Sequence, residues 1–330
     1  MSKQPGIVPD ESDLDRIENA IELKEVEGLS QGQIVFRRFI RHCGAMVSAV
    51  ILFAILTLAA TSIGWGPIPG WWQWGYAEMD PTVVLPGGRP TWVLPFDFGV
   101  HPLGQDNIGR DAFARVMRGT QQSLTVMVII GIVATCIGVT MGSVAGFFRG
   151  RLDTVLMRFT DMVITIPTIM IGAILGVWVR GATAFTLALA LGCVTWTGMA
   201  RLVRGEFLSL REREFVDAAR VAGASNFRII FKHMLPNAMG VIIVNATLLM
   251  ASAILLETAL SYLGFGIVSP DVSLGQLINE YQAAFATRPW LFWWPGFFII
   301  SIALCVNFIG DGLRDAFDPR QRRIPNRRKM

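Results

Sequence analysis

The sequence is poor in charge and in the side chains that usually carry out chemistry. Of its 330 residues only 16% are charged, and it holds three histidines and four cysteines. Soluble domains have about 25% charged residues. Hydrophobic residues, in contrast, make up 52% of this chain, and its mean hydropathy is +0.49. An ordinary soluble domain is therefore excluded.

The shortage of reactive side chains also excludes several kinds of site. None of the lysines follows a glycine, so the sequence lacks the Gly-Lys-Ser or Gly-Lys-Thr of a phosphate-binding loop, and we expect no ATP hydrolysis by this chain. The histidines lie outside the apolar runs and no H-E-x-x-H occurs, which argues against an intramembrane protease. The cysteines lack paired spacing and are expected to be small buried hydrophobic residues. They are Cys43, Cys136, Cys193 and Cys305.

Long apolar runs dominate what the sequence does contain. A helix needs about 20 mostly apolar residues to cross a bilayer, and six segments meet this requirement. We therefore predict an all-α, polytopic membrane protein with six transmembrane helices. The first run follows about 45 residues that include eight acidic ones, so we expect a retained anchor rather than a cleaved signal. The six segments are 46–63, 123–147, 159–179, 182–200, 238–265 and 290–309.

The distribution of basic residues predicts the orientation of these spans. Lysine and arginine resist translocation and gather on the cytoplasmic side. The two tails and the even-numbered loops hold 23 of the 29 basic residues. Both termini are therefore expected in the cytoplasm, and the positive net charge reports topology rather than nucleic-acid binding.

The spans divide the chain into four regions. Residues 1–45 form a cytoplasmic tail, and 46–122 hold the first span and a long external loop. Residues 123–310 form a core of five spans that includes the cytoplasmic loop 201–235, and 311–330 form a basic cytoplasmic tail. A weak amphipathic helix after Ser12 is conceivable, but a solvated acidic tail is expected. The external loop holds a Trp-rich insertion, 65–95, whose role stays open.

The end of the external loop predicts a short helix on the outer membrane surface. Asp106 suits an N-cap, and Gly119 suits a left-handed C-terminal turn. His101, Asp106 and Asp111 lack the paired spacing of metal ligands, so capping and surface roles are expected for them. The apolar face of this helix would comprise Ile108, Phe113, Val116 and Met117.

The cytoplasmic loop predicts two short amphipathic helices. The first spans Glu214 to Ala222, and Gly223 is placed to end it. Its small apolar face, formed with Phe215, Ala218 and Ala219, suits a groove on another protein. Ser225 caps the second, whose apolar face suits the membrane interface, and Pro236 is expected to end it. The periodicity alone leaves two alternatives, a simple elbow and a partner dock. The second face comprises Phe227, Ile230, Phe231, Met234 and Leu235.

The spacing within "DAARVAGASNFRIIFKHMLPN" resembles the EAA loop of bacterial ABC importer permeases. In that family the loop docks into a groove of the ATP-hydrolysing subunit. Asp217 stands where Glu is usual and His233 where Ile is common, and both could modestly alter docking. The resemblance assigns the coupling role to Glu214, Phe215, Asp217, Ala218, Ala219, Gly223, Leu235 and Pro236.

Two further stretches resemble the C-type subunit of dipeptide and oligopeptide permeases. The external "HPLGQDNIGRD" matches that family's motif, with Gln105 where Thr is usual, and "LETALSYLGFG" and "NFIGDGLRDAFDPR" match its fifth span and C-terminal exit. The resemblance covers 46–320 and implies the type I ABC importer transmembrane-domain fold. The external residues that it singles out are Gly104, Asp106, Gly109, Arg110 and Asp111.

The resemblance implies a permease subunit in a bacterial inner or plasma membrane. Its implied partners are a second permease chain, two ATP-binding subunits that hold ATP and Mg²⁺, and an external substrate-binding protein. No cofactor or metal is expected in this chain. Similar permeases carry dipeptides, oligopeptides, glutathione or nickel complexes, and the lack of a Met-rich or His-rich path favours peptides. A secondary transporter is the rival, but no internal repeat supports it.

Four features inside the spans predict structure or gating. Glu257 is either a pore or gate residue or a partner for a neighbouring helix, with neither favoured. Asp161 lies near the cytoplasmic end of its span and is expected to be structural. Pro167 is expected to kink the third span, either lining a channel wall or simply tolerated by packing. A glycine every fourth residue predicts a close helix contact, at Gly138, Gly142 and Gly146.

Overall fold

The computed structural model describes residues 31–79, 88–91, 99–178 and 183–318, and the regular structure within these ranges is helical, as predicted. The possible helix after Ser12 lies outside them. The elements are α2 (Gln31–Arg41), α3 (Cys43–Ser62), α4 (Ala112–Phe148), α5 (Gly150–Thr165), α6 (Thr168–Trp178), α7 (Ala184–Gly192), α8 (Thr197–Arg211), α9 (Glu214–Val221), α10 (Asn226–Arg228), a π-helical turn (Ile229–Met234), α11 (Leu235–Tyr262), α12 (Leu274–Tyr281), a 3₁₀ turn (Gln282–Ala284) and α13 (Pro289–Phe317).

The described residues hold up to six spans, if each of two bent helix pairs counts as one span. Helices α3, α4, α11 with its preceding turn, and α13 are each long and apolar enough to cross a bilayer. The pairs α5–α6 and α7–α8 qualify only together, bent by 81° and 42°. The larger bend lies at Ile166 and Pro167, which fall outside both helices. The kink predicted at Pro167 is confirmed, because proline cannot donate the next helical hydrogen bond.

The prediction of a short surface helix beginning near Asp106 is wrong. Helix α4 begins at Ala112 and runs for 37 residues, so the polar stretch and the second span form one helix. Its N-cap is Asp111, which accepts a hydrogen bond from the Ala114 amide at 2.8 Å, and not Asp106. Gly119 lies inside the helix, where an added Cβ would meet the Leu274 backbone at 3.0 Å. The glycine therefore permits close packing against α12 and does not end the helix.

The predicted glycine face is confirmed and packs against α8. A Cβ added at Gly138 or Gly146 would come within 3 Å of side chains on α8, namely Met199 and Phe207. Gly142 faces the α8 backbone itself, with the Arg204 amide nitrogen 2.9 Å from the position of such a Cβ. Only glycine allows the two helices to approach this closely.

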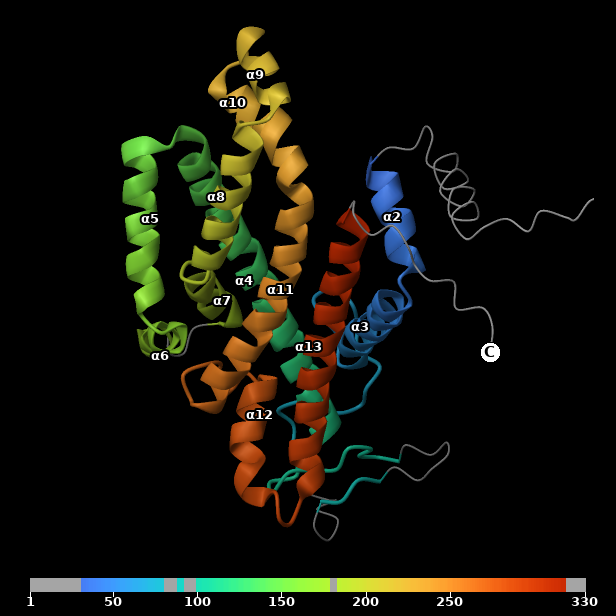
Figure 1. Ribbon diagram of the computed structural model, residues 1–330. Coiled ribbons are helices and arrows are strands. Elements are labelled where there is room, and N and C mark those ends of the chain that lie inside the picture. The colour runs from blue at the N-terminus through green and yellow to red at the C-terminus, as the bar shows by residue number, and fades with distance from the viewer. Residues whose placement is uncertain (1–30, 80–87, 92–98, 179–182, 319–330) are drawn as a thin grey trace, which may run out of the picture.

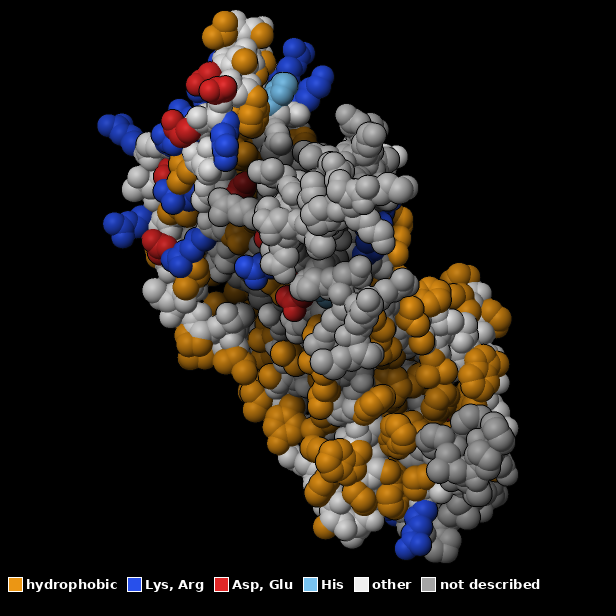
Figure 2. Space-filling model, turned by 45° about the vertical axis from the view of Figure 1, so that its right-hand side comes forward, with side chains coloured by type: hydrophobic (Ala, Val, Ile, Leu, Met, Phe, Trp, Pro, Cys, Tyr) orange, Lys and Arg blue, Asp and Glu red, His pale blue; other side chains and the backbone are white. Residues whose placement is uncertain are grey.

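Around α4, the remaining spans form a bundle that is apolar on the outside. Helix α4 runs through the middle of the bundle, with α11, α13 and α3 beside it and α5 and α6 at one edge (Figure 1). Hydrophobic side chains cover the lower part of the face in Figure 2, whereas charged ones gather at the upper end. This surface suits lipid contact. It also explains why Cys43, Cys136 and Cys193 are exposed, contrary to expectation, while Cys305 is buried.

Replacing Gly142 by leucine is expected to loosen the contact between α4 and α8. The new side chain has no space beside the α8 backbone, so the free energy of unfolding should fall by about 1–3 kcal/mol. The measurement is the midpoint of thermal unfolding in detergent. Gly205→Leu is the matched control, because Gly205 lies on α8 with nothing within 4 Å of an added Cβ. Equal midpoints for the two variants would contradict the proposed packing.

Candidate functional site

Helix α9 and the turn that follows project beyond the spans at one end of the molecule (Figure 1). Gly223 ends α9 with φ +75°, as predicted. The amide of Ala224 donates to the Ala219 carbonyl at 3.0 Å, and that of Gly223 donates to the Arg220 carbonyl at 3.0 Å. These two bonds form a Schellman motif, which requires the left-handed residue. The turn is therefore preformed in the chain itself.

One side of α9 is anchored and the other is left open. Val216 is fully buried among residues of α8 and the π-helical turn, including Phe207 and Ile229. On the outward side Val221 is 91% exposed and Phe215 is 37% exposed. Of the remaining residues predicted for the outward face, Ala218 and Ala222 are exposed and Ala219 is half-buried. The anchor Val216 is not among the residues predicted for this helix, although a large apolar side chain on the opposite side from Ala218 is a usable signal in the sequence.

The second predicted helix is not a separate element. Ser225 caps it as expected, accepting a hydrogen bond from the Arg228 amide at 3.4 Å. The chain then passes through the π-helical turn directly into α11, and Pro236 lies in the first turn of α11 rather than at a break. The prediction that Pro236 ends the helix is wrong. The amide of Leu235 reaches back five residues to Ile230, and this wider turn accommodates the proline.

Two of the five residues in the apolar face predicted for the second helix are exposed. Phe227 and Phe231 are 70% and 52% exposed, and their rings lie 4.3 Å apart. Ile230 and Met234 are buried in the same cluster as Val216, and Leu235 packs partly against it. The exposed aromatic pair therefore sits on a turn whose inner side is fixed to the spans.

Glu257 is fully buried between α11 and α4. Its carboxylate accepts hydrogen bonds from the Ser123 hydroxyl at 2.9 Å and from the Ser261 hydroxyl at 2.7 Å. These donors satisfy a polar group that would otherwise be costly to bury in an apolar interior. The geometry matches the packing alternative, and a gating role stays a prediction. Asp161, near the end of α5, pairs with Arg201 of α8 at 2.5 Å on the surface.

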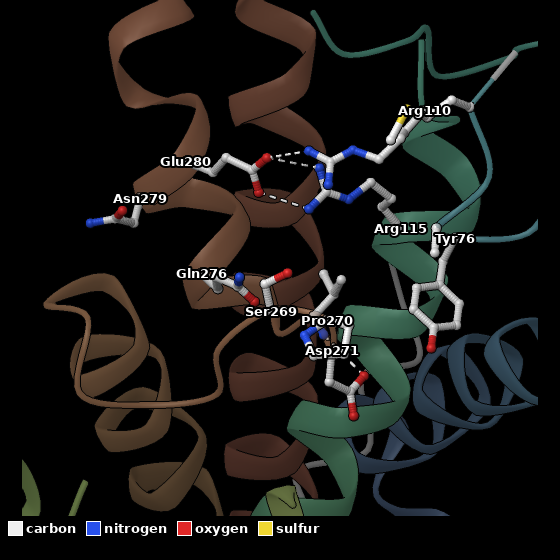
Figure 3. A pocket seen from close by; sticks show the side chains of 12 residues that line it. Tyr76, Arg110, Arg115, Ser269, Pro270, Asp271, Gln276, Asn279 and Glu280 are labelled. Atoms are coloured by element: carbon white, nitrogen blue, oxygen red, sulfur yellow. Dashed lines mark hydrogen bonds and ion pairs between the residues drawn. The ribbon is translucent and has the colours of Figure 1, made fainter. Parts of the chain in front are cut away.

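At the opposite end of the bundle, a charge network joins α4 to α12. Arg115 donates to Glu280 at 2.7 Å and to Asp106 at 3.1 Å, and it also bonds Tyr281. Arg110 bonds Glu280 as well, and its Nε donates to Asp106 at 2.6 Å. Figure 3 shows the Glu280 carboxylate facing both guanidinium groups. The residues expected on a surface helix therefore hold two distant segments together.

The surface roles expected for the acidic residues and His101 are also wrong. His101 and Asp106 are fully buried, and Asp111 is 1% exposed. The predicted capping role is confirmed for Asp111, which caps α4. Asp111 also contacts His101 Nδ1 at 2.8 Å and accepts a hydrogen bond from Trp72 Nε1 at 2.9 Å. The loop can fold this tightly because Gly104 and Gly109 adopt φ +83° and +87°.

The described part of the Trp-rich insertion packs on the start of α4. The rings of Trp72 and Phe113 lie 4.8 Å apart, and Arg118 lies 5.1 Å from the centre of the Tyr76 ring while pairing with Asp271 at 2.8 Å. Next to these contacts is a cavity of about 460 Å³. The side chains around it include Tyr76, Arg110, Arg115, Asp271, Gln276 and Glu280 (Figure 3).

The network changes the ionisation of two groups on α12. Partial burial opposes ionisation of Glu280, but the hydrogen bond and charge of Arg115, with the charge of Arg110, outweigh it and lower the pKa of this carboxyl. Burial raises the pKa of the Tyr281 hydroxyl, which stays neutral. At neutral pH the network therefore has an ionised Glu280 between two arginines.

Comparison with known proteins places the chain among transport components. Residues 138–323 match the family described as "Binding-protein-dependent transport system inner membrane component". The oligopeptide transport system permease protein OppC of Mycobacterium tuberculosis (H37Rv) is 38% identical over 300 residues, covering 90% of this chain and 98% of its own. That of Escherichia coli K12 is 37% identical over 308 residues, 93% of this chain and 97% of its own.

A solved structure shares the fold. The MetNI methionine ABC transporter in an inward-facing conformation matches with a TM-score of 0.51 and 19% identity, over 61% of this chain and 95% of that one. At this identity the likeness concerns the fold alone. It supports the type I ABC importer transmembrane-domain fold that the sequence motifs implied.

Two valines of α9 give a matched test of its anchoring. Val216→Ala should lower the free energy of local unfolding of α9 by about 1–3 kcal/mol, because it leaves a cavity in the buried cluster. Val221→Ala removes the same atoms from an exposed position and should change little. Hydrogen–deuterium exchange of the α9 amides measures the difference. Faster exchange in both variants, or in neither, would show that Val216 does not anchor the helix.

Glu280→Gln tests the charge network and its pH dependence. At pH 7 the free energy of unfolding of the variant should be about 1–3 kcal/mol lower than that of wild type, because the buried Arg115 loses an ionised partner. Since the folded pKa of Glu280 lies below 4.5, the stabilisation is complete well above that value and disappears as the pH falls through the lowered pKa. Unfolding midpoints of both proteins should therefore converge on acidification.

The control for this experiment is Glu212→Gln. Glu212 pairs with Arg149 at 2.6 Å, but both side chains are largely exposed, so its loss should cost little at any pH. A difference between wild type and Glu280→Gln that persisted unchanged at pH 3 would contradict the role of the ionised carboxylate.

Proposed function

Because the chain belongs to the family of binding-protein-dependent transport system inner membrane components, we propose that it forms half of the translocation path of an ATP-driven oligopeptide importer. The peptide substrate is supported by relatives that are oligopeptide permeases and align with 90% or more of this chain. Six spans enclose too little space for a peptide path. A second, related permease chain therefore completes the path.

The coupling part of the proposal rests on one observation: α9 has one exposed side and one side buried against the spans. Its outer side presents Phe215 and Val221 beyond the spans, while Val216 fixes its inner side to α8 and the start of α11. A partner that grips the outer side would move both spans together, because close-packed interiors transmit displacement. The partners are two ATPase subunits, which hold ATP and Mg²⁺. This assignment favours the dock over the simple elbow.

The orientation follows from the same element. The coupling turn, residues 213–228, lies at the end of the bundle where the exposed charges of Figure 2 gather. The loops at that end and the two tails carry most of the basic residues. We place this end, with both termini, in the cytoplasm of a bacterial cell. The network around Arg115 then faces outward, towards a substrate-binding protein.

Nickel complexes and glutathione remain alternative cargoes for the same architecture. Selection among these cargoes would rest largely on the substrate-binding protein, so the permease architecture is compatible with each of them. Uptake of a labelled tripeptide, with Ni²⁺ and glutathione as competitors, distinguishes the three. Transport driven by an ion gradient without ATP would instead support a secondary transporter.

The deciding experiment is co-purification from native membranes with a C-terminal tag. Wild type should recover ATPase subunits and a second permease. Gly223→Arg should lose the ATPases and peptide uptake but keep the second permease, because φ +75° disfavours any residue with a Cβ. Gly223→Asn is the control, since asparagine tolerates this conformation best among the other residues.

Two results would overturn the proposal. Normal peptide uptake by Gly223→Arg at normal protein level would place the coupling element elsewhere. Recovery of the wild-type chain alone, in several detergents, would remove the support for an ABC assembly.

A further inference from the structure

Helix α2 is held at the level of the membrane surface by the span that follows it. A single residue, His42, separates α2 from α3, and its ring caps α3 by accepting from the Ala45 amide at 3.0 Å. At its other side α2 lies near the end of α13, where Arg38 donates to the Asp318 carbonyl at 3.2 Å. Figure 1 shows α2 at the same end of the bundle as the top of α13. It is therefore fixed beside the bilayer and not within it.

The side chains of α2 divide into two adjoining strips. Phe36 and Ile40, one turn apart, are 66% and 46% exposed. Arg37 and Arg41, also one turn apart, follow them around the helix, and the helix carries no acidic residue. These four side chains, with Gln33, line a hollow on the surface of the helix. An apolar strip and a basic strip therefore lie side by side along the exposed surface of α2.

We propose that α2 binds the headgroups of anionic phospholipids, with the arginines on the phosphates and the two apolar side chains at the acyl boundary. A helix with this division of residues lies in the plane of a membrane surface. Basic residues next to an anionic leaflet gain further attraction. The binding site is separate from the coupling turn and does not depend on the transported substrate.

The charge and the apolar strip together select lipid over the other available occupant. The first 30 residues of the chain include eight acidic ones and offer charge complementarity to the arginines. The tail also holds apolar residues such as Leu14, Ile17 and Ile21. Helix α2, however, leads through a single residue into the span α3, which sets both strips at the level of the headgroups. An anionic lipid surface is therefore the better match.

Native mass spectrometry of the detergent-solubilised full-length chain tests the proposal. The protein is mixed with equal amounts of phosphatidylglycerol and phosphatidylcholine, and the ratio of retained lipids is measured. Wild type should prefer phosphatidylglycerol. Arg37→Gln/Arg41→Gln should reduce this preference by roughly tenfold, because two basic residues no longer face the phosphates. Arg37→Lys/Arg41→Lys should keep it, which separates loss of charge from misfolding.

The control for net charge is Arg213→Gln/Arg228→Gln, which removes two exposed arginines from the coupling turn. It should retain the wild-type preference, and millimolar inorganic phosphate should not compete. An unchanged preference in Arg37→Gln/Arg41→Gln, or an equal loss in the control, would overturn the proposal. So would phosphatidylglycerol binding that appears only after residues 1–28 are deleted, because the tail would then be the occupant of α2.

Discussion

The close contact between α4 and α8 is the interaction on which the other parts depend. Gly142 brings the two backbones together, and beside it Phe207 of α8 packs against Gly146. The same Phe207 belongs to the buried cluster that holds Val216 of α9. One side chain therefore links the exposed turn to the central span. Because such interiors are as densely packed as crystals of small molecules, a displacement of α9 has to be shared by the spans.

Within the described residues, several ion pairs hold neighbouring helices together towards the ends of the bundle. At the end near α9, Arg204 pairs with Asp153 at 2.6 Å, and at the far end Arg118 pairs with Asp271 at 2.8 Å. These pairs hold neighbouring helices where water or headgroups solvate them. Inside the spans, the buried carboxyl group of Glu257 accepts hydrogen bonds from two serine hydroxyls, which replace the water that it lacks. The hydrogen-bonded Glu257 and the polar ends together leave a bundle whose middle can contact lipid.

Helix boundaries that differ from the predicted ones share one physical cause. Asp106 and Gly119 have the local chemistry of helix boundaries, but the fold gives each of them a distant partner, Tyr281 and the backbone of Leu274. Pro236 likewise has the chemistry of a helix end, yet a π-helical turn absorbs it. Local propensities contribute about 1 kcal/mol or less, and tertiary contacts override them. The buried state of His101 had no local signal at all.

The sequence by itself determined the features that depend on one segment and its solvent. The apolar runs decided the spans, Pro167 decided the break between α5 and α6, and Gly223 decided the left-handed turn, since a residue's own backbone limits act whatever surrounds it. Only the tertiary structure decided which residues meet. It placed Val216 inside and Val221 outside, and it brought Arg115 to Glu280 across 165 residues, because such contacts are fixed by how whole helices pack and not by any local pattern.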